Sequence, residues 1–204
     1  MRLILSLSLL ATIALTGPAR AGGYFTAEQL AALLLTEAEV AGDHTRSGGG
    51  KGRAKDFDLF GSDACTGAEP ARVPKAVTHA WVSFESNHGT TLDIEINAVG
   101  PALARRIVDD VAAVPVKCPV VPKTRHTAEH TRLPLPDLGK PAAAMVTVYR
   151  YDGLGVDQAR RAVVAYGGLS LTFDEIGTVA PGQAEFIAIV KAGAEKLEGV
   201  GDPR

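Results

Sequence analysis

The chain has 204 residues, with 21 Lys and Arg against 23 Asp and Glu, and a formal net charge of −2. A mildly acidic balance provides no field that attracts phosphates, which argues against general binding of nucleic acid or anionic lipid. The length fits one domain that is large enough to bury a hydrophobic core.

The first 21 residues have the pattern of a secretory signal peptide. Arg2 gives a basic start, residues 3–15 are almost wholly apolar, and Ala19 and Ala21 supply the small residues of a cleavage site. We expect cleavage near Ala21, leaving residues 22–204 as a single secreted domain. Removal of Arg2 and Arg20 leaves 19 basic against 23 acidic residues, because two of the 21 are lost, and the net charge becomes −4. No later segment reaches the roughly 20 apolar residues of a membrane span, so we expect no transmembrane segment.

The chain contains two cysteines, Cys65 and Cys118. An exported chain meets an oxidising compartment, in which two thiols normally pair. We therefore predict a Cys65–Cys118 disulfide bond. A pair of redox-active thiols is the less favoured alternative, because the Cys-x-x-Cys spacing is absent.

The N-terminal part of the domain predicts helix and loop. Thr26 and Gln29 form a capping box, which predicts a helix from Thr26 to about Leu35. Thr36 then begins a second short turn that extends through Val40. Residues 43–55 are rich in glycine and basic side chains, and this composition predicts a flexible loop.

The middle of the chain predicts a β-hairpin followed by a helix. Apolar residues alternate over 78–86 and 91–97, with turn residues between them. Trp81 lies in the first of these strands, and we expect it in the core. Pro101 begins a helix that we expect to end before Pro115. Polar side chains are expected on the opposite face of the second strand: Asp93, Glu95 and Asn97.

The C-terminal part predicts more strands and a last helix. Residues 124–133 read as extended, 143–151 as a strand, 160–176 as a hairpin across two glycines, and a helix follows Pro181. These elements predict an α+β fold with a mostly antiparallel sheet covered on one side by helices. Their order suggests two similar halves, with a cleft where the halves meet.

His126, Glu129 and His130 match the H-x-x-E-H pattern of inverted zinc peptidases. That chemistry needs a helix, which brings two histidines four residues apart to one metal. The surrounding threonines and prolines favour a strand, in which the two histidines would stand roughly 13 Å apart. We therefore favour solvated histidines and keep a zinc-dependent hydrolase as an alternative. Its third ligand would come from one of three glutamates: Glu175, Glu185 or Glu195.

Two other segments resemble functional motifs but lack residues that those motifs require. The segment around Ser170 lacks the last glycine of a nucleophile elbow, and a strand follows it. Residues 48–52 resemble a phosphate-binding loop but lack its Lys-Ser/Thr pair. We assign no catalytic residue and no cofactor. The basic side chains of residues 43–55 permit a further alternative, a secreted inhibitor or protein-interaction module.

Several segments together resemble a known family. They are Leu33–Val40, Cys65, the hairpin over 81–97, the helix up to Cys118, and the run from Val163 through Phe173 before the final helix. This arrangement resembles the PknH-like extracellular sensor domain, a family found outside actinobacterial serine/threonine kinases and in related secreted or lipid-anchored proteins.

The resemblance implies an α+β domain with a central cleft, extracellular ligand binding and no enzymatic activity. Kinase-attached members look to carry two disulfide bonds, whereas this chain has cysteines for one. Only Cys65 and Cys118 match family positions, as a structural bridge, and no ligand-binding residue carries over. We expect a secreted, sensor-like domain whose ligand is a small molecule, a cell-wall fragment or a protein.

Overall fold

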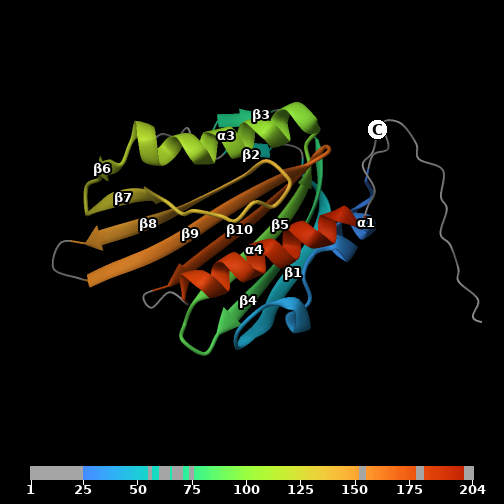
Figure 1. Ribbon diagram of the computed structural model, residues 1–204, viewed down its shortest axis with the longest axis horizontal. Helices are drawn as coiled ribbons and strands as arrows, with labels where there is room; N and C mark the ends of the chain where they lie inside the picture. The colour runs from blue at the N-terminus through green and yellow to red at the C-terminus, as the bar shows by residue number, and fades with distance from the viewer. Residues whose placement is uncertain are drawn as a thin grey trace, which may run out of the picture.

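A computed structural model describes residues 25–54, 57–59, 65, 71–73, 76–151, 155–177 and 182–199. The expected signal peptide lies outside these residues. The described chain forms an eight-stranded sheet in which every neighbouring pair of strands is antiparallel, with helices packed against it (Figure 1). The predicted α+β fold is confirmed.

The strand order in the large sheet is β1-β4-β5-β10-β9-β8-β7-β6. The strands of this sheet are β1 (His44–Ala54), β4 (Val77–Ser86), β5 (Thr91–Ala98), β6 (Val120–Pro122), β7 (His126–Arg132), β8 (Ala142–Tyr151), β9 (Gly155–Tyr166) and β10 (Leu169–Gly177). A separate two-stranded sheet pairs β2 (Phe57–Leu59) with β3 (Ala71–Val73). β5 pairs with β10, so the expected halves share one continuous sheet.

Local signals account for several boundaries. Helix α1 (Ala27–Leu33) is capped by Thr26, whose side chain accepts a hydrogen bond from the Gln29 backbone, as predicted. A short 3₁₀ helix, η1 (Glu37–Glu39), follows it. The predicted hairpins are β4–β5 and β9–β10, and Gly89 and Gly167 give their turns a positive φ that favours glycine.

The two longer helices lie on opposite faces of the sheet. Helix α4 (Gln183–Glu198) shares a core with α1, and α3 (Pro101–Lys117) builds a second core (Figure 1). β9 shows why: Ala162 and Val164 belong to the first core, whereas Val163 and Ala165 belong to the second. Because side chains alternate along a strand, this unbroken apolar run needs cover on both faces. The expectation of helices on one side was wrong.

Residues 43–55 do not form the predicted flexible loop, because most of them belong to strand β1. β1 pairs with β4 along its length, and Gly50 lies opposite Trp81. A Cβ atom on Gly48 or Gly50 would lie within 3.3 Å of the Trp81 indole, so the ring packs directly on the glycine backbone. Tertiary pairing and this aromatic cover overcome the weak strand propensity of glycine.

A disulfide bond joins Cys65 to Cys118, as the sequence predicts. Cys118 caps the C-terminal end of α3, which continues past Pro115 to Lys117 and so is slightly longer than expected. The bond therefore ties the end of α3 to a segment that is 53 residues away in sequence.

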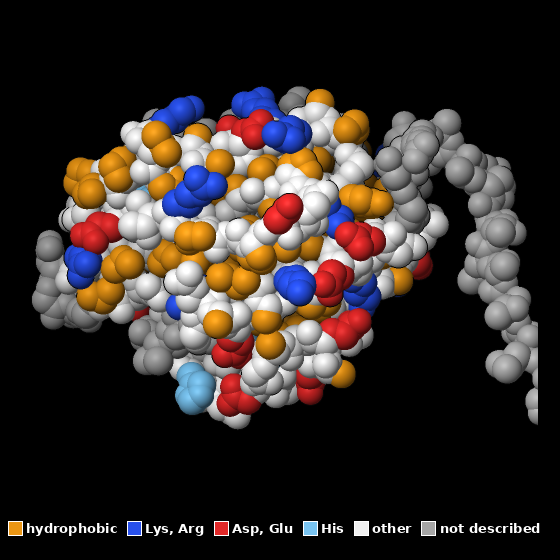
Figure 2. Space-filling view, in the orientation of Figure 1, with side chains coloured by type: hydrophobic (Ala, Val, Ile, Leu, Met, Phe, Trp, Pro, Cys, Tyr) orange, Lys and Arg blue, Asp and Glu red, His pale blue; other side chains and the backbone are white. Residues whose placement is uncertain are grey.

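No helix in the described ranges is long and apolar enough to cross a membrane. The face that carries α4 displays acidic and basic side chains interspersed with small apolar patches (Figure 2). Mixed charge of this kind keeps a surface hydrated and gives it no single strong field.

Candidate ligand-binding site

The face of the sheet that carries α3 is only partly covered by that helix. α3 packs over Ala128, Met145 and Val163 in a common core. Further along the same strands, the side chains of this face border a cavity of about 160 Å³. The cavity is lined by Lys123, His126, Ala128, His130, Met145, Thr147, Tyr149, Ala159, Arg161, Asp174 and Ile176. The four strands β7 to β10 therefore build its floor.

His130 is the most buried polar side chain of this cavity apart from Thr147, its direct neighbour on β8. Only 6% of His130 is exposed, and its Nδ1 atom lies 3.0 Å from the Thr147 hydroxyl oxygen. Burial and, to a smaller degree, the positive charge of Lys123 lower the pKa of His130, which favours the neutral imidazole at neutral pH. Its Nε2 atom is buried and has no hydrogen-bond partner among the described residues. Leaving such an atom unpaired costs about 1–3 kcal/mol.

Charged side chains surround this neutral histidine. Arg161 and Asp174 lie opposite each other on β9 and β10 and form a two-pronged ion pair: Nε of Arg161 contacts one carboxylate oxygen, and Nη2 lies 2.8 Å from the other. Lys123, in the turn between β6 and β7, adds a positive charge that no described carboxylate lining the cavity matches. Counted over the described lining residues alone, the cavity wall therefore carries a formal excess of one positive charge.

The rings of His126 and Tyr149 form another side of the cavity. The ring of His126 lies 5.6 Å from the Tyr149 ring in an edge-on arrangement and 5.2 Å from the Tyr151 ring. These residues pair because His126 on β7 lies opposite Tyr151 on β8. Flat, apolar ring faces beside polar groups are typical of sites for small organic ligands.

The H-x-x-E-H segment does not form the arrangement of a zinc peptidase. His126, Glu129 and His130 lie on β7, as the predicted extended conformation implies, and Glu129 points to the face opposite the two histidines. There it forms an ion pair with Arg150 at 2.8 Å, which lowers the pKa of Glu129. Among the described residues no three His, Cys, Asp or Glu side chains are grouped so that they could hold a metal ion. The hydrolase alternative loses its structural basis, and the cavity gives the two histidines a different setting from free solvation.

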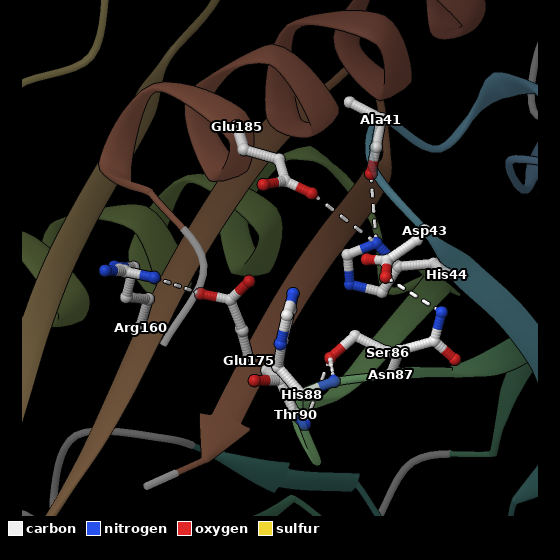
Figure 3. A network of polar contacts seen from close by, with 10 residues as sticks. All are labelled: Ala41, Asp43, His44, Ser86, Asn87, His88, Thr90, Arg160, Glu175 and Glu185. Atoms are coloured by element: carbon white, nitrogen blue, oxygen red, sulfur yellow. Dashed lines mark hydrogen bonds and ion pairs between the residues drawn. The ribbon is translucent and has the colours of Figure 1, made fainter. Parts of the chain in front are cut away.

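A second polar cluster is buried on the opposite face, near the start of α4 (Figure 3). Arg160 donates a hydrogen bond of 2.6 Å to Glu175, and both side chains are at least 92% buried. His44 lies nearby with its Nδ1 atom 2.9 Å from the Ala41 carbonyl and 3.8 Å from the Glu185 carboxylate (Figure 3). Burial raises the pKa of Glu175, whereas Arg160 opposes that rise.

The three glutamates considered as a third metal ligand lie away from the two histidines of the zinc motif. Glu175 shares a face of β10 with Phe173, whereas Asp174 and Ile176 face the cavity with His130. Glu185 contacts His44, and Glu195 pairs with Lys191 on the outer surface of α4. None of the three glutamates lines the cavity.

The other residues singled out from the sequence take structural places. Ser170 is fully buried in β10, with strand on both sides, so it forms no exposed nucleophile. Trp81 is 40% exposed and packs over β1, and is thus not the core residue expected. It borders a wider groove of about 480 Å³ between β1 and the α1–η1 segment. Residues 48–52 belong to β1 and form no phosphate loop.

Sequence reasoning found His126 and His130 but missed their neighbours. Strand alternation alone places Thr147 and Tyr149 on one face of β8. It also places Arg161 and its neighbour, the apolar Ala162, on opposite faces of β9. The missing information was the pairing of β7 with β8 and of β9 with β10, which sets these side chains around one cavity.

Comparison with known proteins supports the fold assignment. No family model matches the chain, and no curated protein matches it. The structure is similar to the crystal structure of the extracellular domain of PknH from Mycobacterium tuberculosis, with a TM-score of 0.53 and 16% sequence identity. The similarity covers 86% of this chain and 98% of that domain. The chain therefore has a PknH-like extracellular domain fold.

Proposed function

We propose that this chain is a non-enzymatic, sensor-like module that binds a small ligand outside the cytoplasm, after removal of a signal peptide near Ala21. The observation that carries the proposal is the cavity over β7 to β10, where a buried imidazole with an unpartnered nitrogen lies among charged and aromatic side chains. A concave site with a few convergent polar groups is the usual form of a ligand pocket.

Two further observations support an extracytoplasmic role. The Cys65–Cys118 bond is of a kind that forms and persists mainly in oxidising compartments, which supports this part of the proposal. The fold is shared with a domain described as extracellular. Fold similarity at this level carries no ligand with it, so the site itself must be tested.

A fragment screen by protein NMR tests the proposal. We expect small fragments, drawn equally from acids, amines and neutral compounds, to shift backbone resonances of the strands that line the cavity. Ala159→Leu fills the cavity and should reduce these shifts, because Ala159 lines it. Val156→Leu is the matched control on the same strand: Val156 is 48% exposed and lies on the other face by strand alternation.

The outcome separates this site from the groove beside β1. If the resonance shifts cluster around Trp81 and are unchanged in the Ala159→Leu variant, the ligand binds in the groove beside β1 instead. The proposal would be rejected if no fragment of any charge shifted a cavity resonance.

A further inference from the structure

We infer that the cavity over β7 to β10 takes a small organic monoanion, a carboxylate attached to a single ring. This inference rests on the proposed function and adds the chemical class of the ligand. It follows from the balance of charge, the available hydrogen-bond partners and the size of the cavity.

The charge balance favours an anion. Arg161 and Asp174 neutralise each other across β9 and β10 through two contacts. Lys123 remains as the one charged side chain of the lining without a described carboxylate partner there. One carboxylate at the cavity mouth would match this charge, whereas a cation would be repelled and a dianion would leave a charge unmatched.

His130 supplies a second group for the same carboxylate. Its imidazole is held in the neutral form by burial, and Thr147 fixes the ring through Nδ1. When the Thr147 hydroxyl donates to Nδ1, the Nε2 atom carries the proton and becomes a donor. That nitrogen has no acceptor among the described residues and is closed to solvent. A carboxylate oxygen would satisfy it once the neighbouring side chains of the cavity wall move to admit the ligand.

The size and the walls favour one ring. The cavity volume is about 160 Å³. An apolar cavity of about 150 Å³ is known to hold one benzene molecule. The rings of His126 and Tyr149, 5.6 Å apart, and the side chains of Met145 and Ile176 provide flat and apolar surfaces for such a ring.

Three probes of similar size test the inference: benzoate, benzamide and benzylammonium, each titrated against the full mature chain and followed by NMR. We expect benzoate to shift the cavity resonances with an affinity about tenfold higher than benzamide, the size of a charge-assisted hydrogen bond. Benzylammonium should bind most weakly.

Lys123→Gln is the diagnostic variant. Lys123 is exposed, so the substitution should leave the fold intact. It should remove most of the preference for benzoate and leave benzamide binding unchanged. Lys191→Gln is the matched control, because Lys191 is 60% exposed on α4, on the other face of the sheet.

The two proposals fail in different ways. If benzamide or benzylammonium binds as well as benzoate, or if Lys123→Gln keeps the preference, the cavity binds ligands but the monoanion inference is overturned. If none of the three probes and no other fragment shifts a cavity resonance, the proposed function fails as well.

Discussion

The two faces of the sheet are built differently. On the α1–α4 face, a core that includes Phe84, Phe173 and Phe186 is fully buried and runs across the sheet. On the α3 face, the helix covers a smaller core, and side chains of β7 to β10 beyond this core line a cavity. One face therefore holds the larger core together with a buried Arg160–Glu175 ion pair, whereas the other borders a cavity lined by charged and aromatic side chains.

The largest expected effect comes from breaking the ion pair inside the closed face. Glu175→Leu leaves the Arg160 guanidinium buried without its 2.6 Å partner. We expect a loss of about 3–5 kcal/mol in the free energy of unfolding. Urea denaturation measures it.

The double variant Arg160→Met/Glu175→Leu sharpens this test. Replacing both charges by apolar side chains should restore most of the lost stability, because the desolvation cost of the pair also disappears. A double variant that is as unstable as the sum of both single variants would show that the two side chains act independently.

The second largest effect concerns the α3 face. Reduction of the Cys65–Cys118 bond, or the double variant Cys65→Ser/Cys118→Ser, releases a loop whose ends are 53 residues apart. The chain-entropy model gives a loss of about 4 kcal/mol as an upper value. Denaturation with and without a reductant measures it. The reductant should not alter the serine double variant, which is the control.

Loosening this bond should affect the two faces unequally. Hydrogen exchange should increase first in α3, whose end carries Cys118, while α4 keeps its protection. Equal loss of protection in α3 and α4 would contradict the view that the two cores are separate units.

A smaller effect is the response of the cavity to pH. Burial in the folded protein holds the His130 pKa below the ordinary histidine value of 6.5, so the unfolded chain binds a proton more readily than the folded one. The stability contribution of His130 is therefore full above about pH 6.5 and declines as pH falls toward the lowered pKa. His130→Gln should make the melting temperature less dependent on pH in this window.

The measurement compares melting temperatures at about pH 7.5 and about pH 5.5 for the protein and the variant. His88→Gln is the control, because His88 is exposed in the β4–β5 turn and lies outside the cavity. If both variants change the pH response equally, the effect does not come from the cavity.

The smallest effect tests how the N-terminal segment is held against α4. The Lys196 ammonium donates hydrogen bonds of 2.8 Å to the Leu34 carbonyl and 2.6 Å to Glu39. Hydrogen bonds from Lys196 and Thr36 lower the pKa of Glu39 from 4.5 to about 2. The contribution of Glu39 to the stability of the fold is therefore present above pH 4.5 and is lost as the pH falls through about 2. Because Glu39 is 42% exposed, Glu39→Gln should cost less than about 1 kcal/mol at neutral pH, measured by thermal denaturation.

A matched control is Glu195→Gln. Its partner Lys191 lies one turn away on the same helix, and both side chains are more than half exposed. We expect a loss of only about 0.3 kcal/mol, and less in high salt. A larger loss for Glu195 than for Glu39 would argue against a stabilising link between the N-terminal segment and α4.

Sequence reasoning worked best where the signal is local. The Thr26 capping box, the two hairpins and the extended conformation around His126 to His130 follow from neighbouring residues. It failed for residues 43–55, because glycine carries no strand signal of its own. Trp81, about 30 residues away, provides the packing that holds the glycines of β1 in the sheet.

The candidate site was predicted only in part for the same reason. The sequence drew attention to His126 and His130 through a zinc motif, but the chemistry of the site depends on Thr147, Arg161 and Lys123. These residues come together only after β7 pairs with β8 and β9 with β10. Pairings over such distances depend on the burial of whole faces, which no short motif encodes.

The sequence by itself determined the local elements, the pairing of its two cysteines and the alternation that gives each strand two distinct faces. Capping, turn chemistry and side-chain periodicity act within a few residues, so they can be read along the chain. Only the tertiary structure decided that β5 pairs with β10, that α3 and α4 cover opposite faces, and that α3 leaves a cavity beyond its edge. Those features arise when distant apolar surfaces compete to be buried, and the outcome depends on the whole fold.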